Sequence, residues 1–147
     1  MKKILRSIRS LACTGVLAWT CVLAAASQDL SFEDAWIRAT PPGMNMTAGF
    51  GQLHNTGAGA IELVSFSSPE FADVTLHRTE LVDGVSRMRE VPLLRIPAGE
   101  TVELAPGGYH LMLMMPRGAA SGEQAIRVDM NAADGRVFRF TIPVKRR

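Results

Sequence analysis

The sequence has 147 residues, with 16 basic and 14 acidic side chains and a formal net charge of +2. Four basic residues lie in the first nine positions, so the chain beyond residue 26 carries twelve basic and fourteen acidic side chains, a formal charge of −2. This balance excludes the basic surface of a nucleic-acid-binding protein, and we expect no nucleic-acid partner.

The first 26 residues have the pattern of a secretory signal peptide. Its positive region contains four basic side chains, Lys2, Lys3, Arg6 and Arg9. An apolar run, Leu11 to Leu23, follows, and the alanines at 24–26 offer an A-x-A cleavage site. The apolar run is shorter than the ~20 residues that span a bilayer, which argues against a retained anchor. We therefore predict an exported, periplasmic protein with no stable membrane insertion after cleavage.

Both cysteines, Cys13 and Cys21, lie within this segment. Neither has a leucine three residues before it, so a lipoprotein pattern is not indicated. Cleavage leaves residues 27–147 as a single domain without a thiol or a disulfide. Because burial alone must hold an exported domain of this kind together, we favour a full β-sandwich or barrel over a disulfide scaffold.

Beyond residue 26, apolar and polar residues alternate more often than apolar residues recur every 3.6 positions, which predicts strands. The expected strands are 35–40, 48–55, 61–67, 73–81, 86–92, 100–104, 109–115, 124–130 and 136–144. Turn residues rich in Gly, Pro, Asn and Asp separate most of them. Asp83-Gly84, between two strand-like runs, is the strongest hairpin signal. Short strands at regular intervals, with no long amphipathic segment, predict an all-β antiparallel sandwich.

Strand parity groups several soft metal donors on common faces. Successive side chains on a strand point to opposite faces. His110, Met112 and Met114 therefore share one face, and the leucines between them point toward the core. His77 and Met88 stand on either side of the Asp83-Gly84 turn, so the hairpin can bring them together.

Two imidazoles and two thioethers form a donor set that suits Cu(I). His77, Met88, His110 and Met112 supply it here. Both kinds of donor bind at neutral pH without deprotonation, unlike a thiolate. A neutral set leaves the positive charge of the ion uncompensated, so we expect a solvent-exposed site at an end or edge of the sandwich. Exposure would also let the ligands of a partner replace these one at a time.

Each of these residues has an ordinary explanation when it is considered singly. A methionine in an apolar strand is more often core packing than a ligand, and we interpret His54 as a polar residue near a turn. Compatible parity of all four donors favours a metal site. For Met44, Met46 and Met114 we prefer loop or lining roles, and a transient thioether contact during copper loading stays the alternative.

The sequence resembles the periplasmic copper chaperone family PCu(A)C. The signature of that family is His, ten residues, Met, twenty-one residues and His-x-Met, which matches His77, Met88, His110 and Met112 without adjustment. The segments AWIRATPPG (35–43), GVSRMR (84–89) and PGGYHLMLM (106–114) are also similar to the family. The resemblance extends from about Ala35 to Val144.

The resemblance implies a cupredoxin-like Greek-key sandwich that binds one Cu(I) through these four side chains. It also implies delivery of copper to the binuclear copper centre of cytochrome c oxidase, directly or through a thiol-containing assembly factor. Family members often have Met after the first His, where this chain has Arg78; parity points residue 78 away from the site. Some relatives carry a His- and Met-rich tail, which is not found before Arg147.

We expect a metal carrier rather than an enzyme, because no catalytic carboxylate–histidine pair, nucleophile motif or phosphate-binding glycine loop stands out. A blue-copper electron carrier needs a cysteine thiolate and a thiol oxidoreductase needs cysteines, which residues 27–147 lack. A buffering protein for Cu(I) or Ag(I) would use the same ligands, so that alternative stays open. A sandwich that binds no metal is the least favoured interpretation.

Overall fold

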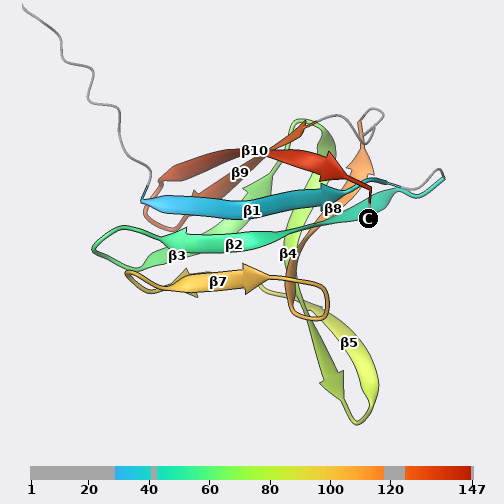
Figure 1. The fold of residues 1–147 in the computed structure, drawn as a ribbon, viewed down its shortest axis with the longest axis horizontal. Coiled ribbons are helices and arrows are strands. Elements are labelled where there is room, and N and C mark those ends of the chain that lie inside the picture. Colours follow the sequence, from blue (N-terminus) through green and yellow to red (C-terminus); the bar gives the residue numbers. More distant parts are fainter. Residues whose placement is uncertain (1–28, 41–42, 118–124, 147) are drawn as a thin grey trace, which may run out of the picture.

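The computed structural model describes residues 29–40, 43–117 and 125–146, and the predicted signal peptide lies outside these ranges. The described residues form ten strands and no helix (Figure 1). The strands are β1 (Leu30–Arg38), β2 (Met46–Asn55), β3 (Ile61–Ser67), β4 (Phe71–Val82), β5 (Val85–Glu90), β6 (Leu94–Ile96), β7 (Thr101–Leu104), β8 (Tyr109–Pro116), β9 (Ala125–Ala132) and β10 (Val137–Lys145). Accordingly, no helix in these ranges is long and apolar enough to cross a bilayer. The all-β prediction is confirmed.

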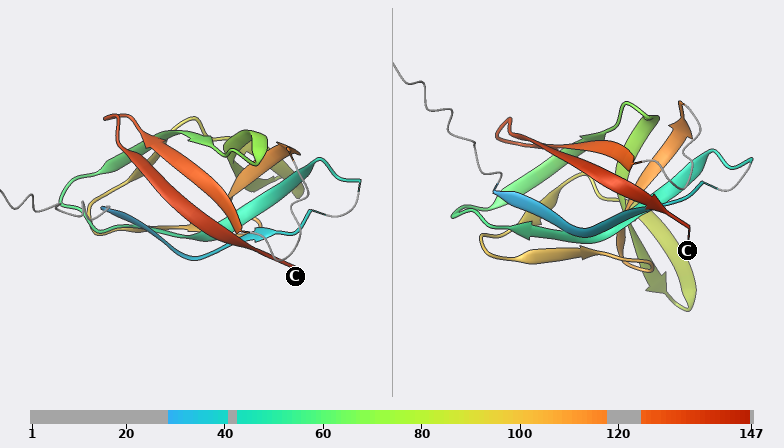
Figure 2. Two further views of the ribbon diagram at one scale, coloured as in Figure 1. Left: turned by 90° about the horizontal axis from the view of Figure 1, so that it is seen from above. Right: turned by 45° about the horizontal axis from the view of Figure 1, so that its top comes forward.

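The strands close into one barrel-like ring rather than two separate sheets. The ring runs β4, β8, β2, β1, β10, β9, β3 and back to β4, the last link being the single pair Phe66–Val74. Most neighbours are antiparallel, while β1 pairs with β10 in parallel. Among the described strands, β5 pairs with β4 alone, and this hairpin extends beyond the rest of the barrel (Figures 1 and 2).

The inside of the ring is a single apolar core. Every strand of the ring contributes to it through alternating residues, as expected when one face of a sheet is buried. The largest fully buried side chains are Phe71, Leu30, Ile37, Leu53, Ile61, Leu63, Leu76, Ile96, Leu104, Leu111, Leu113 and Ile126. The core therefore fixes which face of β4 and β8 points inward.

Eight of the predicted strands lie within one to two residues of their observed bounds, and two differences have clear causes. The first strand begins at Leu30 rather than Ala35, because a β-bulge between Glu33 and Trp36 lets pairing continue across the acidic pair. Asp34 takes a φ of 49° there. Strand β6 was not predicted, because three residues between prolines are too few to show alternation.

The Asp83-Gly84 turn forms the predicted hairpin. Both residues have positive φ, 53° and 77°, as a two-residue type I′ loop requires. Val82 pairs with Val85 directly beside the turn. This loop fixes the register of the whole β4–β5 hairpin.

Candidate metal centre

The predicted donors on β4 and β8 lie on the outer face of the barrel. Leu111 and Leu113 are fully buried in the core, so the residues that alternate with them face outward, as predicted. The cross-strand pairs on this outer face are His77–His110, Thr75–Met112, Met112–Ala48 and Met114–Met46. Three neighbouring strands, β4, β8 and β2, thus place imidazoles, thioethers and small side chains on one surface. Two carboxylates lie at its margins, Asp73 opposite Met114 and Glu90 opposite His77.

The two histidines are direct cross-strand partners. The ring centroids of His77 and His110 are 6.0 Å apart, with an interplanar angle of 37°. His110 is only 5% exposed. It is backed by Phe50, whose ring centroid is 6.4 Å from the imidazole and 4.8 Å from the indole of Trp36. Packing against aromatic rings restricts the orientation of this imidazole.

One hydrogen bond sets the tautomer of His110. Its Nδ1 lies 3.1 Å from the carbonyl oxygen of Gly108. A carbonyl only accepts, so Nδ1 carries the proton and donates it to this bond. Nε2 is then left with a free lone pair, which is the arrangement that metal-binding histidines usually show.

His77 has the complementary arrangement. Its Nε2 lies 3.0 Å from the hydroxyl of Thr75, two residues earlier on the same face. Its Nδ1 is buried and has no hydrogen-bond partner among the described residues. When Nε2 donates to Thr75, Nδ1 presents an unprotonated lone pair. A buried nitrogen without a partner is costly unless something occupies it, and a soft cation fits that need.

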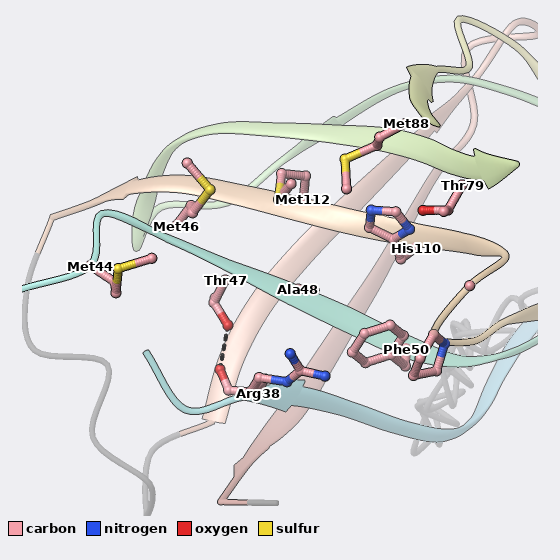
Figure 3. A pocket seen from close by; sticks show the side chains of 12 residues that line it. Arg38, Met44, Met46, Thr47, Ala48, Phe50, Thr79, Met88, His110 and Met112 are labelled. Carbon is pink, nitrogen blue, oxygen red and sulfur yellow. Dashed lines mark hydrogen bonds between the residues drawn. The ribbon is translucent and has the colours of Figure 1, made fainter. Parts of the chain in front are cut away.

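Met88 reaches the same face from the edge strand. It pairs with Thr79 on β4, which places it diagonally beside His77. The side chain is 50% exposed, so the thioether is at the surface. Met88, Met112 and His110 line one pocket of about 370 Å³ (Figure 3). His77 lies beside this pocket, opposite His110, and is not part of its lining.

The rest of the pocket lining is mainly neutral. Its further members are Arg38, Met44, Met46, Thr47, Ala48, Phe50, Thr79, Pro106 and Gly107. The guanidinium carbon of Arg38 is 5.6 Å from the Phe50 ring centroid, and none of the described residues that line the pocket is a carboxylate. Across the described ranges, no three His, Cys, Asp or Glu side chains lie close enough to hold a metal ion. The donors gathered here are therefore soft sulfur and imidazole nitrogen.

Three residues outside the predicted donor set, Arg78, His54 and Met114, are not part of the pocket lining. Arg78 points away from the histidines, with its guanidinium carbon 5.2 Å from the Tyr109 ring centroid. His54 lies on β2 away from the pocket, and its Nδ1 is 2.9 Å from the hydroxyl of Thr101. Met114 shares the outer face with Met112 and is not part of the pocket lining.

Two residues that orient the histidines were missed at the level of sequence. Thr75 and Gly108 each stand two residues before a predicted donor, and each binds the ring nitrogen that would not face the metal. The sequence alone indicates that Thr75 lies on the same strand face as His77, because the two residues are two positions apart. The sequence does not indicate the contact between Gly108 and His110, because this contact depends on the conformation of the loop before β8.

The fold and the site together define an all-β barrel domain with a surface pocket of thioether and imidazole donors. A family model described as "Putative lipoprotein LpqE-like" matches residues 30–144, so the chain belongs to the LpqE-like family. The chain is 39% identical over 112 residues to the "Putative lipoprotein Lxx21020" of Leifsonia xyli subsp. xyli. That alignment covers 76% of this chain and 66% of the relative, so the chain spans slightly less than two thirds of it.

Several of the solved structures that it resembles are PCuAC domains. The solution structure of apo-DR1885 from Deinococcus radiodurans is 27% identical with a TM-score of 0.64, covering 100% of this chain and 97% of that one. CuI-DR1885 is 29% identical, with a TM-score of 0.62 and 83% coverage of both chains. The copper-bound PCuAC domain from PmoF2, 18% identical, shares the fold with a TM-score of 0.67, over 83% of this chain and 97% of that one. The predicted resemblance is thus confirmed at the level of the fold.

Proposed function

We propose that this protein is an exported copper carrier that binds one Cu(I) through His77, Met88, His110 and Met112. The observation that carries the proposal is the pair of imidazoles. Their ring centroids are 6.0 Å apart, and in each ring one nitrogen contacts a neighbouring residue, which leaves the other nitrogen available. Two thioethers stand beside them on the same outer face. Such neutral soft donors select Cu(I) over harder divalent ions.

The relatives support this assignment. DR1885 has been solved with CuI and a PmoF2 domain with copper bound. For this chain we propose the cupredoxin-like Greek-key arrangement of strands. The lipoprotein description of the family supports an exported protein of the cell envelope. We place it in the periplasm, released by signal-peptide cleavage.

Delivery is the role that the open site favours. Met88 is half-exposed on an edge strand, so the ligands of a partner can displace the thioether without unfolding the barrel. We propose the binuclear copper centre of cytochrome c oxidase as the recipient, directly or through a thiol-containing assembly factor. The alternative role is buffering of periplasmic Cu(I) or Ag(I), which uses the same ligands and needs no recipient.

The binding assignment is tested by titrating residues 27–147 with Cu(I) against a chromophoric chelator under anaerobic conditions. We expect one Cu(I) per chain, and Met88→Leu and His110→Ala should each weaken binding by about 10- to 100-fold. Met115→Leu and His54→Ala are matched controls, since Met115 is 54% exposed and neither residue lines the pocket. Unchanged affinity in both site variants would contradict the assignment.

Delivery and buffering are separated by a transfer assay. The copper-loaded protein is mixed with the soluble copper-binding domain of the oxidase, or with the assembly factor, and copper on each partner is measured after separation. Transfer that is faster than the spontaneous dissociation of Cu(I) supports delivery. Transfer at the dissociation rate with every partner supports buffering.

A further inference from the structure

Four of the seven methionines in the described part of the chain line one pocket. Met88 and Met112 belong to the proposed four-ligand site, while Met44 and Met46 do not. In Figure 3, the thioethers of Met44, Met46, Met112 and Met88 follow one another along the pocket toward His110. The pocket is therefore longer than a single copper site requires.

Packing does not explain the two outer methionines. Met44 is 53% exposed and Met46 is 40% exposed, whereas the core methionine Met130 is fully buried. A half-exposed thioether gains little of the free energy that burial provides. Their side chains are flexible and polarizable, which suits a changing set of ligands.

Strand register brings Met46 within reach of Met112. Met46 lies opposite Met114, and Ala48 lies opposite Met112, so Met46 and Met112 are diagonal neighbours on one face. Diagonal cross-strand neighbours are ~7–8 Å apart, within reach of long side chains. Because Ala48 is small, no bulky side chain on β2 stands between the two methionines.

We propose that Met44 and Met46, together with Met112, form an outer thioether site that receives Cu(I) and passes it to the four-ligand site. This inference rests on the proposed function. Met112 belongs to both sites and stays bound while Met44 and Met46 are exchanged for the two imidazoles and Met88. The ion remains Cu(I) throughout. Thioethers carry no proton, and a neutral imidazole binds through the ring nitrogen that bears no hydrogen, so the exchange of ligands transfers no electron or proton.

The outer site is tested in a variant whose four-ligand site has lost two of its donors. His77→Leu combined with Met88→Leu removes two donors while keeping approximately the volume of the side chains. Cu(I) is added to residues 27–147 of this variant with ¹³C-methyl-labelled methionine, and the NMR spectrum is recorded. We expect weaker residual binding, with shifts of the Met44, Met46 and Met112 methyl signals. The Met115 signal should not move.

Two further substitutions in that background decide the result. Met44→Leu with Met46→Leu should reduce the residual Cu(I) affinity at least about tenfold. Met115→Leu, equally exposed but outside the pocket, should leave it intact. The inference is overturned when the Met44 and Met46 methyl signals stay in place, or when the leucine pair leaves the residual affinity unchanged.

The outcome is independent of the four-ligand assignment. That assignment fails when Met88→Leu and His110→Ala bind Cu(I) as tightly as the parent protein. The outer-site proposal is contradicted only by unmoved methyl signals of Met44 and Met46, or by an unchanged residual affinity in the Met44→Leu, Met46→Leu variant. If the doubly substituted background does not give a dispersed, folded spectrum, the same comparison is made with Met88→Leu alone.

Discussion

At the scale of single residues, the proposed site depends on groups that contact the ring nitrogen of each imidazole that would not bind the metal. The carbonyl of Gly108 accepts both Nδ1–H of His110 and the backbone N–H of Thr79, at 3.1 and 3.0 Å. It therefore links the orientation of a donor on β8 to the backbone of β4. The hydroxyl of Thr75 contacts Nε2 of His77 from the same strand, as donor or as acceptor.

Thr75→Val removes this hydroxyl and keeps the shape of the side chain. We expect Cu(I) affinity to fall by about 10- to 100-fold, because loss of an orienting partner frees the His77 ring and its tautomer. ¹⁵N NMR of the imidazole should show the His77 proton shared between both nitrogens. Thr101→Val is the matched control, since Thr101 bonds His54 away from the pocket. An unchanged His77 tautomer and affinity would remove Thr75 from this role.

At the scale of elements, the hairpin β4–β5 carries Met88 on the least supported strand. All six residues of β5 are exposed, and the strand pairs only with β4. Such an edge opens at low free energy compared with the core strands. Met88, the proposed ligand that a partner would displace, thus lies on a strand that we expect to open more easily than the core strands.

The turn at Asp83-Gly84 controls this hairpin. Gly84 has a φ of 77°, so Gly84→Ala should destabilise the hairpin by about 1 kcal/mol and raise the hydrogen-exchange rate of β5 amides about fivefold. The core strands should keep their protection. Gly59→Ala is the control, because a Cβ at Gly59 meets nothing within 4 Å and its φ is not positive. Equal exchange rates in both variants would show that the turn does not limit β5.

The same two elements show how far sequence reasoning reaches. A two-residue loop at 83–84 fixes the β4–β5 register, so the Thr79–Met88 pair follows from the sequence. Alternation likewise assigns His77 and His110 to the outer face. Their direct pairing does not follow, because no short loop joins β4 to β8 and register across a long connection depends on the packed core. The pocket wall of Phe50 and Arg38 comes from other strands for the same reason.

At the scale of the whole molecule, the barrel separates stability from binding. The inner face of β4 and β8 holds the core, and the outer face holds the proposed donors His77, His110 and Met112. A charged ion on the outer face keeps part of its solvation, which a cysteine-free, apolar core would deny it. The pocket of about 370 Å³ also leaves room for the ligands of a second protein beside the bound ion.

Processing of the N-terminus decides where this barrel works. A lipid on Cys21 would leave eight residues before Leu30, which span at most ~29 Å, so the barrel would stay close to the membrane. Cleavage after Ala26 would instead release it into the periplasm. We expect intact-mass spectrometry of the exported protein to give an unmodified chain that starts at Ser27.

Fractionation with two cysteine variants tests the same prediction. Cys13→Ser and Cys21→Ser should each leave the protein in the soluble periplasmic fraction at the parent level, because neither thiol remains after cleavage. A membrane-bound parent that becomes soluble in one of these variants would identify that cysteine as a lipid anchor. Since the family is described as lipoproteins, that result would replace free diffusion of the carrier with delivery over a short tether at the membrane surface.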